Sequence, residues 1–272
     1  MNHELEELTK KVCLIVEDAG KFIAREFGKV QEAEIELKDH NSLVSYVDKN
    51  AEEMLVTALS ELIPSSGFIT EEETVDNLSP DYIWIIDPLD GTTNFLYNIP
   101  HFSTSVALQY KGELVLGVIT DIMRDDIYYA WKNGGAYMNN KKISVSSRKD
   151  FSNCVIGTGF PYDSSYSKKP YFEMLEVIMR DARGLRRFGS AALDMAYVAC
   201  GRFDAFYETS LNPWDVAGGI VICKEAGSAC SDYFDGKEYE SGQSIIVANP
   251  VIQQFIVSYT TEFFDQEKIA LQ

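Results

Sequence analysis

The sequence predicts an α/β fold in which mixed sheets are layered with helices. Three observations along the 272 residues support this prediction. A helical period near the start gives way to several strand patterns in the middle, and the second half alternates helix and strand signals. Such a pattern favours helices packed on the faces of sheets. Apolar residues make up 46% of the chain and charged residues 24%, values typical of a folded globular protein.

The first part of the chain predicts two amphipathic helices. Apolar residues from Leu5 to Ile23 recur at helical spacing, so we expect a helix over about residues 4–27 that ends near Gly28. A second helix is expected from about Lys49 to Leu62, because apolar residues again share one face and Pro64 follows.

The middle of the chain predicts a sheet. Tyr82–Ile86 is a continuous apolar run, typical of a buried strand, that leads straight into Asp87. Three further strands are expected at Ser103–Tyr110, Glu113–Thr120 and Ile127–Trp131, with turn residues between them. These strands predict an antiparallel meander.

The second half predicts alternating elements. Helices are expected near Tyr171–Arg183 and Ser190–Cys200, from Pro213 to about Ala226, and after Pro250. Strands are expected at Phe203–Tyr207 and Ile245–Ala248. We find no repeat, low-complexity stretch or clear linker.

The charge balance is acidic, with 42 Asp and Glu against 24 Lys and Arg and a formal net charge of −18. Such a surface repels nucleic acid and anionic membranes unless basic residues gather locally. One short basic cluster is present, formed by Arg180, Arg183, Arg186 and Arg187. We therefore expect no nucleic-acid or membrane partner. If the substrate is an anion, bound metal ions are the obvious source of positive charge.

The five cysteines are odd in number, widely spaced and without a CxxC pair. This pattern is typical of reduced thiols in a cytosolic protein and argues against a disulfide framework or a zinc site. The opening MNHELEELTKK lacks a signal-peptide core, and no apolar run approaches the roughly 18 residues of a membrane span. We expect a soluble, cytoplasmic protein.

The segment Asp87-Pro88-Leu89-Asp90-Gly91-Thr92 is the strongest candidate for chemistry. Two carboxylates three residues apart follow a predicted strand, and the glycine permits close approach of a ligand to the backbone. Carboxylate and carbonyl oxygens suit magnesium, and backbone N–H groups at a helix start bind phosphate. The alternative is an ordinary polar turn.

Four further segments carry candidate residues, and each has a structural alternative. Glu71-Glu72-Glu73 follows an apolar run and could be a solvated face. Asp215 opens a predicted helix, where it could serve the helix dipole, and Asp48 could cap one. Gly189-Ser190-Ala191-Ala192 is either tight packing or a substrate-binding helix start. A Ser-His-Asp site is not supported, since suitable partners are lacking for His3, His40 and His101.

Together these segments resemble the inositol monophosphatase family of magnesium-dependent, lithium-sensitive phosphatases. The resemblance covers about residues 36–250 and rests on WIIDPLDGTTNF and WDVAGG, which are highly specific as a pair. It implies an α-β-α-β-α sandwich of the inositol monophosphatase and fructose-1,6-bisphosphatase type, and a homodimer. It also implies one domain over residues 1–272, with an α+β half to about 150 and an α/β half from about 151.

The resemblance implies two or three Mg²⁺ ions per active site. First-metal ligands would be Glu71, Asp87 and the Leu89 carbonyl, and second-metal ligands would be Asp87, Asp90 and Asp215. Thr92 and Asp48 would orient and deprotonate the attacking water, with Glu71 as a third catalytic residue.

The resemblance also implies a substrate site. The phosphate would face the N–H groups of Gly91 and Thr92. The polyol hydroxyls would be held by Gly189, Ser190, Ala191, Asp90, Glu208 and Asp215.

Three departures from the family pattern are present. Thr70 replaces a usual glycine, Ser45 replaces a usual threonine, and Lys38 lies one residue too near Asp48, so we leave Lys38 out of the site.

The expected reaction is direct hydrolysis of inositol 1-phosphate or a similar small polyol monophosphate by metal-activated water. The haloacid dehalogenase superfamily offers an alternative with a covalent aspartate, but there a single residue separates the two acids. Alternative substrates within the family are histidinol phosphate, fructose bisphosphate and nucleotide 3′-phosphates. Some bacterial members instead serve as partners of the transcription apparatus, so a non-enzymatic regulatory role also stays open.

Overall fold

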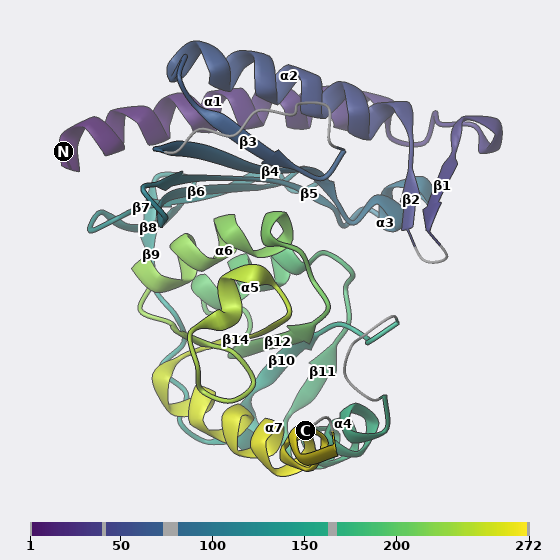
Figure 1. Cartoon of the computed structure of the whole chain (residues 1–272), viewed down its shortest axis with the longest axis vertical. Coiled ribbons are helices and arrows are strands. Elements are labelled where there is room, and N and C mark those ends of the chain that lie inside the picture. Colours follow the sequence, from purple (N-terminus) through teal and green to yellow (C-terminus); the bar gives the residue numbers. More distant parts are fainter. Residues whose placement is uncertain (1, 40–41, 73–80, 163–167, 271–272) are drawn as a thin grey trace.

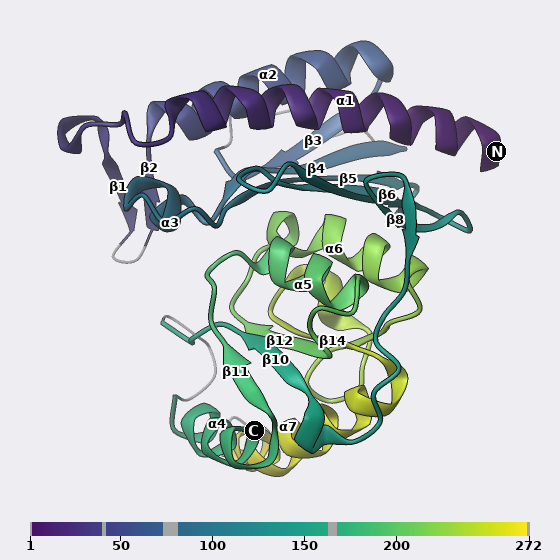
Figure 2. The same cartoon turned by 180° about the vertical axis from the view of Figure 1, so that it is seen from behind.

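The computed structural model describes residues 2–39, 42–72, 81–162 and 168–270. Five layers are stacked in Figure 1, and they confirm the predicted α-β-α-β-α sandwich. One outer layer holds α1 (Asn2–Glu26) and α2 (Tyr46–Leu62), which lie side by side in both Figure 1 and Figure 2. The middle layer holds α5 (Ala191–Ala199) and α6 (Pro213–Glu225), and the other outer layer holds α4 (Lys168–Asp181) and α7 (Pro250–Ala270).

The larger sheet has seven strands in sequence order. Its first strand is parallel to the second and all later neighbours are antiparallel, which confirms the predicted meander. The strands are β3 (Gly67–Thr70), β4 (Tyr82–Asp90), β5 (Ser103–Tyr110), β6 (Glu113–Asp121), β7 (Asp126–Trp131), β8 (Gly135–Met138) and β9 (Lys141–Ile143).

The smaller sheet has the order β11-β10-β12-β14-β13 and mixes parallel with antiparallel pairs. Its strands are β10 (Val155–Thr158), β11 (Gly184–Arg186), β12 (Ala205–Thr209), β13 (Ala229–Ser231) and β14 (Ser244–Ala248). Sequence patterns predicted only β12 and β14 of this sheet. The remaining short elements are β1 (Glu36–Asp39), β2 (Ser42–Val44), α3 (Thr92–Leu96) and the 3₁₀ turns Glu32–Glu34, Phe151–Asn153 and Glu238–Ser241.

Two element boundaries differ from prediction for physical reasons. Helix α2 begins at Tyr46 instead of Lys49, because Ser45 is its N-cap and Asp48 lies inside its first turn in a capping box. Strand β4 was expected to end at Ile86, but it continues to Asp90 through an irregular pairing with β5. The structure therefore places the first two candidate acids of that segment in the sheet.

The middle layer of helices packs tightly between the two sheets. Helix α6 approaches β6 backbone to backbone, since a Cβ on Gly117 would lie 2.4 Å from the carbonyl oxygen of Gly218. Buried apolar side chains from both sheets and from α5 and α6 surround this contact, among them Ile119, Leu193, Ile220 and Val247. The distance between α6 and the larger sheet is therefore set by two residues without side chains.

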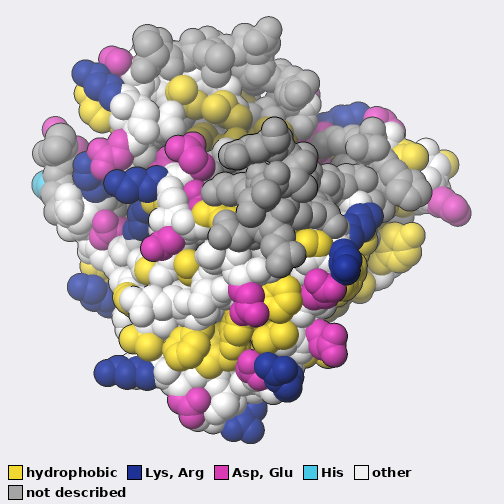
Figure 3. Space-filling model, turned by 60° about the horizontal axis from the view of Figure 1, so that its bottom comes forward, with side chains coloured by type: hydrophobic (Ala, Val, Ile, Leu, Met, Phe, Trp, Pro, Cys, Tyr) yellow, Lys and Arg dark blue, Asp and Glu magenta, His cyan; other side chains and the backbone are white. Residues whose placement is uncertain are grey.

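The described surface agrees with the predicted charge pattern. Lys and Arg side chains are scattered over the face in Figure 3, and the side chains described there form no basic patch. The basic cluster of the sequence is divided: Arg180 pairs with Asp181, and Arg183 donates to Asn153.

None of the helices in the described part of the chain has the length and apolarity needed to cross a bilayer. All five cysteines are free thiols.

Candidate active site

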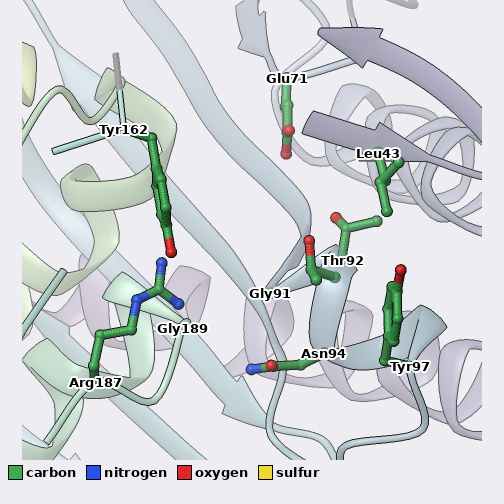
Figure 4. Close-up of a pocket in the computed structure, with 10 residues that line it drawn as sticks. Leu43, Glu71, Gly91, Thr92, Asn94, Tyr97, Tyr162, Arg187 and Gly189 are labelled. Carbon is green, nitrogen blue, oxygen red and sulfur yellow. The ribbon is translucent and has the colours of Figure 1, made fainter. Parts of the chain in front are cut away.

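Two neighbouring cavities bring the predicted site residues together. The larger, of about 560 Å³, is lined by Glu71, Gly91 and Thr92 among others, and Figure 4 shows its walls. The smaller, of about 160 Å³, is lined by predicted residues from both halves of the chain, namely Asp90, Gly189, Ser190, Ala191, Glu208 and Asp215. Arg187 and Gly189 line both cavities, so the two form one continuous site.

The end of β4 carries the first acids into this site. Asp87 pairs with Ser105 and Asp90 with Ser103, so β4 has one more residue than β5 between these pairs. Asp87 is 1% exposed, and its Oδ1 accepts a hydrogen bond from the Leu89 N–H at 3.0 Å. Gly91 follows with φ of 93°, a conformation that favours glycine, and serves as the N-cap of α3.

Asp90 connects the two halves of the chain. Its Oδ2 accepts hydrogen bonds from Ser190 Oγ at 2.6 Å and from the Ala192 N–H at 2.8 Å. Ser190 is itself the N-cap of α5. This contact places the predicted polyol-binding segment directly beside the predicted metal loop.

Four acids in this region act on one another. Burial raises the pKa of Asp87 well above its ordinary value, and the charges of Glu71, Asp90 and Asp215 raise it further. Burial and then the charge of Asp90 do the same to the pKa of Asp215. Like charges in a buried site favour protonation unless a cation compensates them. The four carboxyls therefore form a site that needs positive charge.

The donor set fits a hard divalent cation. In the described residues no group of three or more His, Cys, Asp or Glu side chains stands close enough to hold a metal ion as arranged. Mutual repulsion of like charges acts to keep such carboxylates apart. The chemistry of the donors nevertheless matches magnesium, which binds carboxylate and carbonyl oxygens. The residues that would hold it are Glu71, Asp87, Leu89, Asp90 and Asp215.

Thr92 and Asp48 are in contact although 44 residues separate them. The Thr92 hydroxyl lies 3.0 Å from Asp48 Oδ1 and 2.9 Å from the Leu89 carbonyl oxygen. Asp48 is 1% exposed, and burial raises its pKa against the hydrogen bonds from Ser45 and Thr92. The predicted water-orienting pair is therefore assembled at the wall of the larger cavity.

Asp48 and Asp215 each use one carboxylate oxygen for a helix cap. Asp48 Oδ2 accepts from the N–H and the hydroxyl of Ser45, both at 2.8 Å. Asp215 Oδ2 accepts from the Asn212 N–H at 2.7 Å. The capping role considered for Asp48 is thus present, whereas Asp215, for which a helix-dipole role was considered, takes part in a cap as well. Neither cap uses the second oxygen of the carboxylate. Ser45 makes the cap although the family usually has threonine there.

The smaller cavity is lined, beside Asp90 and Asp215, by small residues and by Glu208. Gly189 has φ of 87°, a left-handed conformation that favours glycine, directly before the N-cap of α5. Glu208 projects from β12, and burial raises its pKa to about 8 against the opposing charge of Arg187. Its carboxylate packs on Gly159, at the end of β10.

Sequence reasoning missed three residues of the site. Arg187 lines both cavities and Asp194 lines the smaller one. Asn94 donates from Nδ2 to the carbonyls of His101 and Phe188, both at 2.8 Å, and so ties α3 to the segment before α5. The signal available for Arg187 was its place two residues before Gly189.

The histidines do not form a catalytic triad in the described residues. His101 is buried, burial lowers its pKa to about 4, and its Nε2 has no hydrogen-bond partner there. His40 and Glu73 lie outside the described residues, as does the side chain of Lys38.

Comparisons with known proteins agree with this geometry. The inositol monophosphatase family model matches residues 4–263. An inositol-1-monophosphatase of Mesorhizobium japonicum is 40% identical over 88% of this chain and 90% of its own. A Nus factor SuhB of Escherichia coli K12 is 35% identical over 92% of this chain and 94% of its own. A solved IMPase of Thermotoga maritima, 30% identical, superposes with a TM-score of 0.86 over 96% of this chain and 99% of that one.

The layered fold and these matches define a protein of the phosphatase class. The chain belongs to the inositol monophosphatase family.

Proposed function

We propose that this protein is a magnesium-dependent phosphomonoesterase that hydrolyses inositol 1-phosphate or a similar small polyol monophosphate. One observation carries the proposal. Burial and the charges of neighbouring acids, Glu71 and Asp90 among them, raise the pKa values of Asp87 and Asp215, and these four acids lie in one site with the hydrogen-bonded pair of Thr92 and Asp48. A site that needs cations, next to a pair able to accept a proton from water, suits hydrolysis of a phosphate ester.

The phosphate would occupy the larger cavity and the leaving group the smaller one. Magnesium held by the four acids would neutralise phosphoryl charge and lower the pKa of bound water. Thr92 has a single hydroxyl hydrogen and two acceptors within reach, Asp48 and the Leu89 carbonyl. When that hydrogen is donated to Asp48, the Thr92 oxygen can accept from a water molecule. The proton lost by the water can then pass through Thr92 to Asp48.

A covalent aspartate mechanism is less well supported. Asp87 would be the nucleophile, but it is 1% exposed and does not line either cavity. Its Oδ1 is also held by the Leu89 N–H. Trapping of an aspartyl-phosphate on Asp87 would overturn our mechanism in favour of this one.

The deciding test is a panel of phosphomonoesters assayed with magnesium, with and without lithium. We expect inositol 1-phosphate to be preferred over histidinol phosphate, fructose bisphosphate and nucleotide 3′-phosphates, and lithium to inhibit. Asp90→Asn should abolish turnover in a folded protein, because a ligand charge is lost. Near-normal turnover by that variant at saturating magnesium would contradict the proposed ligation.

The polyol substrate is supported by similarity to a named inositol-1-monophosphatase and by the compact smaller cavity of about 160 Å³. A nucleotide would need more room than this cavity offers.

We also propose that the protein forms a homodimer, as the family resemblance implies. Light scattering coupled to gel filtration measures the mass directly, and a monomer mass near 30.6 kDa would contradict this proposal.

A second role as a protein partner of the transcription apparatus is favoured by the similarity to Nus factor SuhB of Escherichia coli. It is compatible with phosphatase activity. A pull-down with wild-type protein and Asp90→Asn distinguishes the roles, since recovery of transcription proteins by both would show binding that is independent of catalysis. Recovery of none would contradict this second role.

A further inference from the structure

Arg187 is a cation in a site otherwise built of acids. Among the described residues that line the two cavities, it is the one with a positively charged side chain. In Figure 4 its guanidinium lies beside the Tyr162 ring, across the larger cavity from Thr92 and Glu71. It therefore lines both the cavity expected to hold the phosphate and the smaller cavity.

The guanidinium is held by aromatic rings. Its central carbon lies 5.8 Å from the ring centroids of both Phe160 and Tyr162, within the range of a cation–π contact. Gly189 gives it room on another side, because a Cβ there would meet Arg187 Nη1 at 2.5 Å. These contacts position the group without using its N–H donors.

Those donors have no acceptor among the residues that the structure describes. In the described part of the chain, the Arg187 side chain has no hydrogen bond and no ion pair, whereas its neighbours Arg183 and Arg186 both donate hydrogen bonds. A guanidinium offers five N–H donors in a rigid plane. A positioned arginine with unused donors at a cavity wall is suited to bind a ligand.

The charges around Arg187 indicate which ligand it suits. Asp194 and Glu208 line the smaller cavity with it, and their pKa values, which burial raises, are lowered by its charge. Oδ1 of Asp194 has no hydrogen-bond partner in the described residues. Asp90 and Asp215 line the same small cavity, so a second phosphate or carboxylate on the leaving group would face four carboxyl groups and be poorly accommodated. Hydroxyl groups, which both donate and accept, suit a cavity that offers N–H donors beside carboxylates.

We propose that Arg187 is a substrate-contacting residue that determines specificity, donating hydrogen bonds to hydroxyl oxygens of the polyol leaving group while Glu208 accepts from neighbouring hydroxyls. The inference rests on the proposed function. Arg187 thereby favours a polyol over an unsubstituted ring of the same size.

The main test compares two substrates and four proteins, and fructose 1,6-bisphosphate serves as a third substrate for wild type and Arg187→Gln. Inositol 1-phosphate and cyclohexyl phosphate share a six-membered ring and a phosphate, but only the first has further hydroxyls. Wild type, Arg187→Gln and Arg187→Lys are assayed with magnesium. Arg186→Gln is the matched control, because it removes the same charge from the adjacent residue, whose Nη1 donates to the Leu185 carbonyl.

Arg187→Gln should raise KM for inositol 1-phosphate by roughly 10- to 100-fold, the range for hydrogen bonds from a charged group, with kcat nearly unchanged. KM for cyclohexyl phosphate should not change. Arg187→Lys should recover part of the loss, and Arg186→Gln should match wild type.

Three results would overturn the assignment. An equal rise in KM for both substrates would indicate a role toward the phosphate or in structure, and no rise would indicate no contact. A larger loss on fructose 1,6-bisphosphate than on inositol 1-phosphate would indicate recognition of a second anion. The wild-type measurements judge the proposed function separately, since failure to hydrolyse inositol 1-phosphate would overturn that function before any variant is compared.

Discussion

The carboxylate of Glu208 lies directly against the Cα of Gly159. A Cβ built on Gly159 would fall 1.6 Å from Oε1 and 1.9 Å from Cδ of Glu208, so no other residue fits there while Glu208 keeps its position. The glycine at the end of β10 therefore determines where a predicted substrate ligand on β12 can stand.

Gly159→Ala should impair substrate binding without unfolding the protein. The added methyl group displaces Glu208, and a displacement of about 1 Å can cost roughly 100-fold in catalytic efficiency. We expect KM for inositol 1-phosphate to rise at least about tenfold, measured by phosphate release. Gly184→Ala is the control, because its Cβ would meet nothing closer than 3.4 Å. A wild-type KM for Gly159→Ala would show that Glu208 does not bind the substrate.

Asp48→Asn should separate catalysis from folding. The amide oxygen can still accept from Ser45 and preserve the helix cap, but the side chain can no longer take a proton from water through Thr92. We expect kcat to fall by roughly 10²- to 10⁴-fold, as for loss of a general base, with Tm within a few degrees of wild type. Adding Thr92→Val should cost little more, since the two residues act as a unit. A kcat close to wild type would exclude Asp48 as the proton acceptor.

The metal-free protein should lose stability as pH rises. Burial raises the pKa of Glu208 from 4.5 to about 8, so the folded state holds a proton that the unfolded state has released between these values. The stabilisation is complete below pH 4.5 and is lost as pH rises through 8, at most about 1.4 kcal/mol per pH unit. Tm measured in EDTA should fall over this range, and Glu208→Gln should flatten the fall. An unchanged slope in that variant would contradict the assignment.

Magnesium should stabilise the folded protein. An ion that binds only the folded state adds about 2.7 kcal/mol at a concentration of 100 times Kd. We expect a rise in Tm of several degrees with magnesium, and little or none in Asp87→Asn. Asp150→Asn makes the same chemical change at a residue that caps the 3₁₀ turn Phe151–Asn153, so it should respond like wild type. Equal responses in all three proteins would place the ion elsewhere.

Sequence patterns predicted the long elements of the fold because long elements repeat their period several times. Helix α1, strands β4–β7 and helix α6 belong to this group. The short strands β10, β11 and β13 have three or four residues each, too few to show a period. Their identity depends on pairing within the sheet, β10 with β12, β11 with β10 and β13 with β14, which local sequence does not encode.

Apart from Asp194, the acids of the site were predictable because each lies in a distinctive string near an element boundary. Arg187 was not, since its one local signal, its place two residues before Gly189, does not show that its side chain reaches the cavities. Its position depends on Phe160 and Tyr162, which belong to a different segment. Asp48 and Asp215 showed a different limit. Sequence reasoning set capping against function for Asp48 and the helix dipole against function for Asp215, whereas each carboxylate caps a helix with one oxygen and keeps a second oxygen for another role.

The glycine contact between β6 and α6 acts as a spacer for the site. Asp215 lies in the first turn of the helix whose Gly218 packs on Gly117, while Asp87 and Asp90 belong to β4, in the sheet on the other side of that contact. Thickening this contact by a single methyl group would move one acid away from the other two without altering any residue that lines the cavities. The distance between Asp215 and the two acids of β4 is thus determined by the contact of Gly117 with Gly218, two residues that line neither cavity.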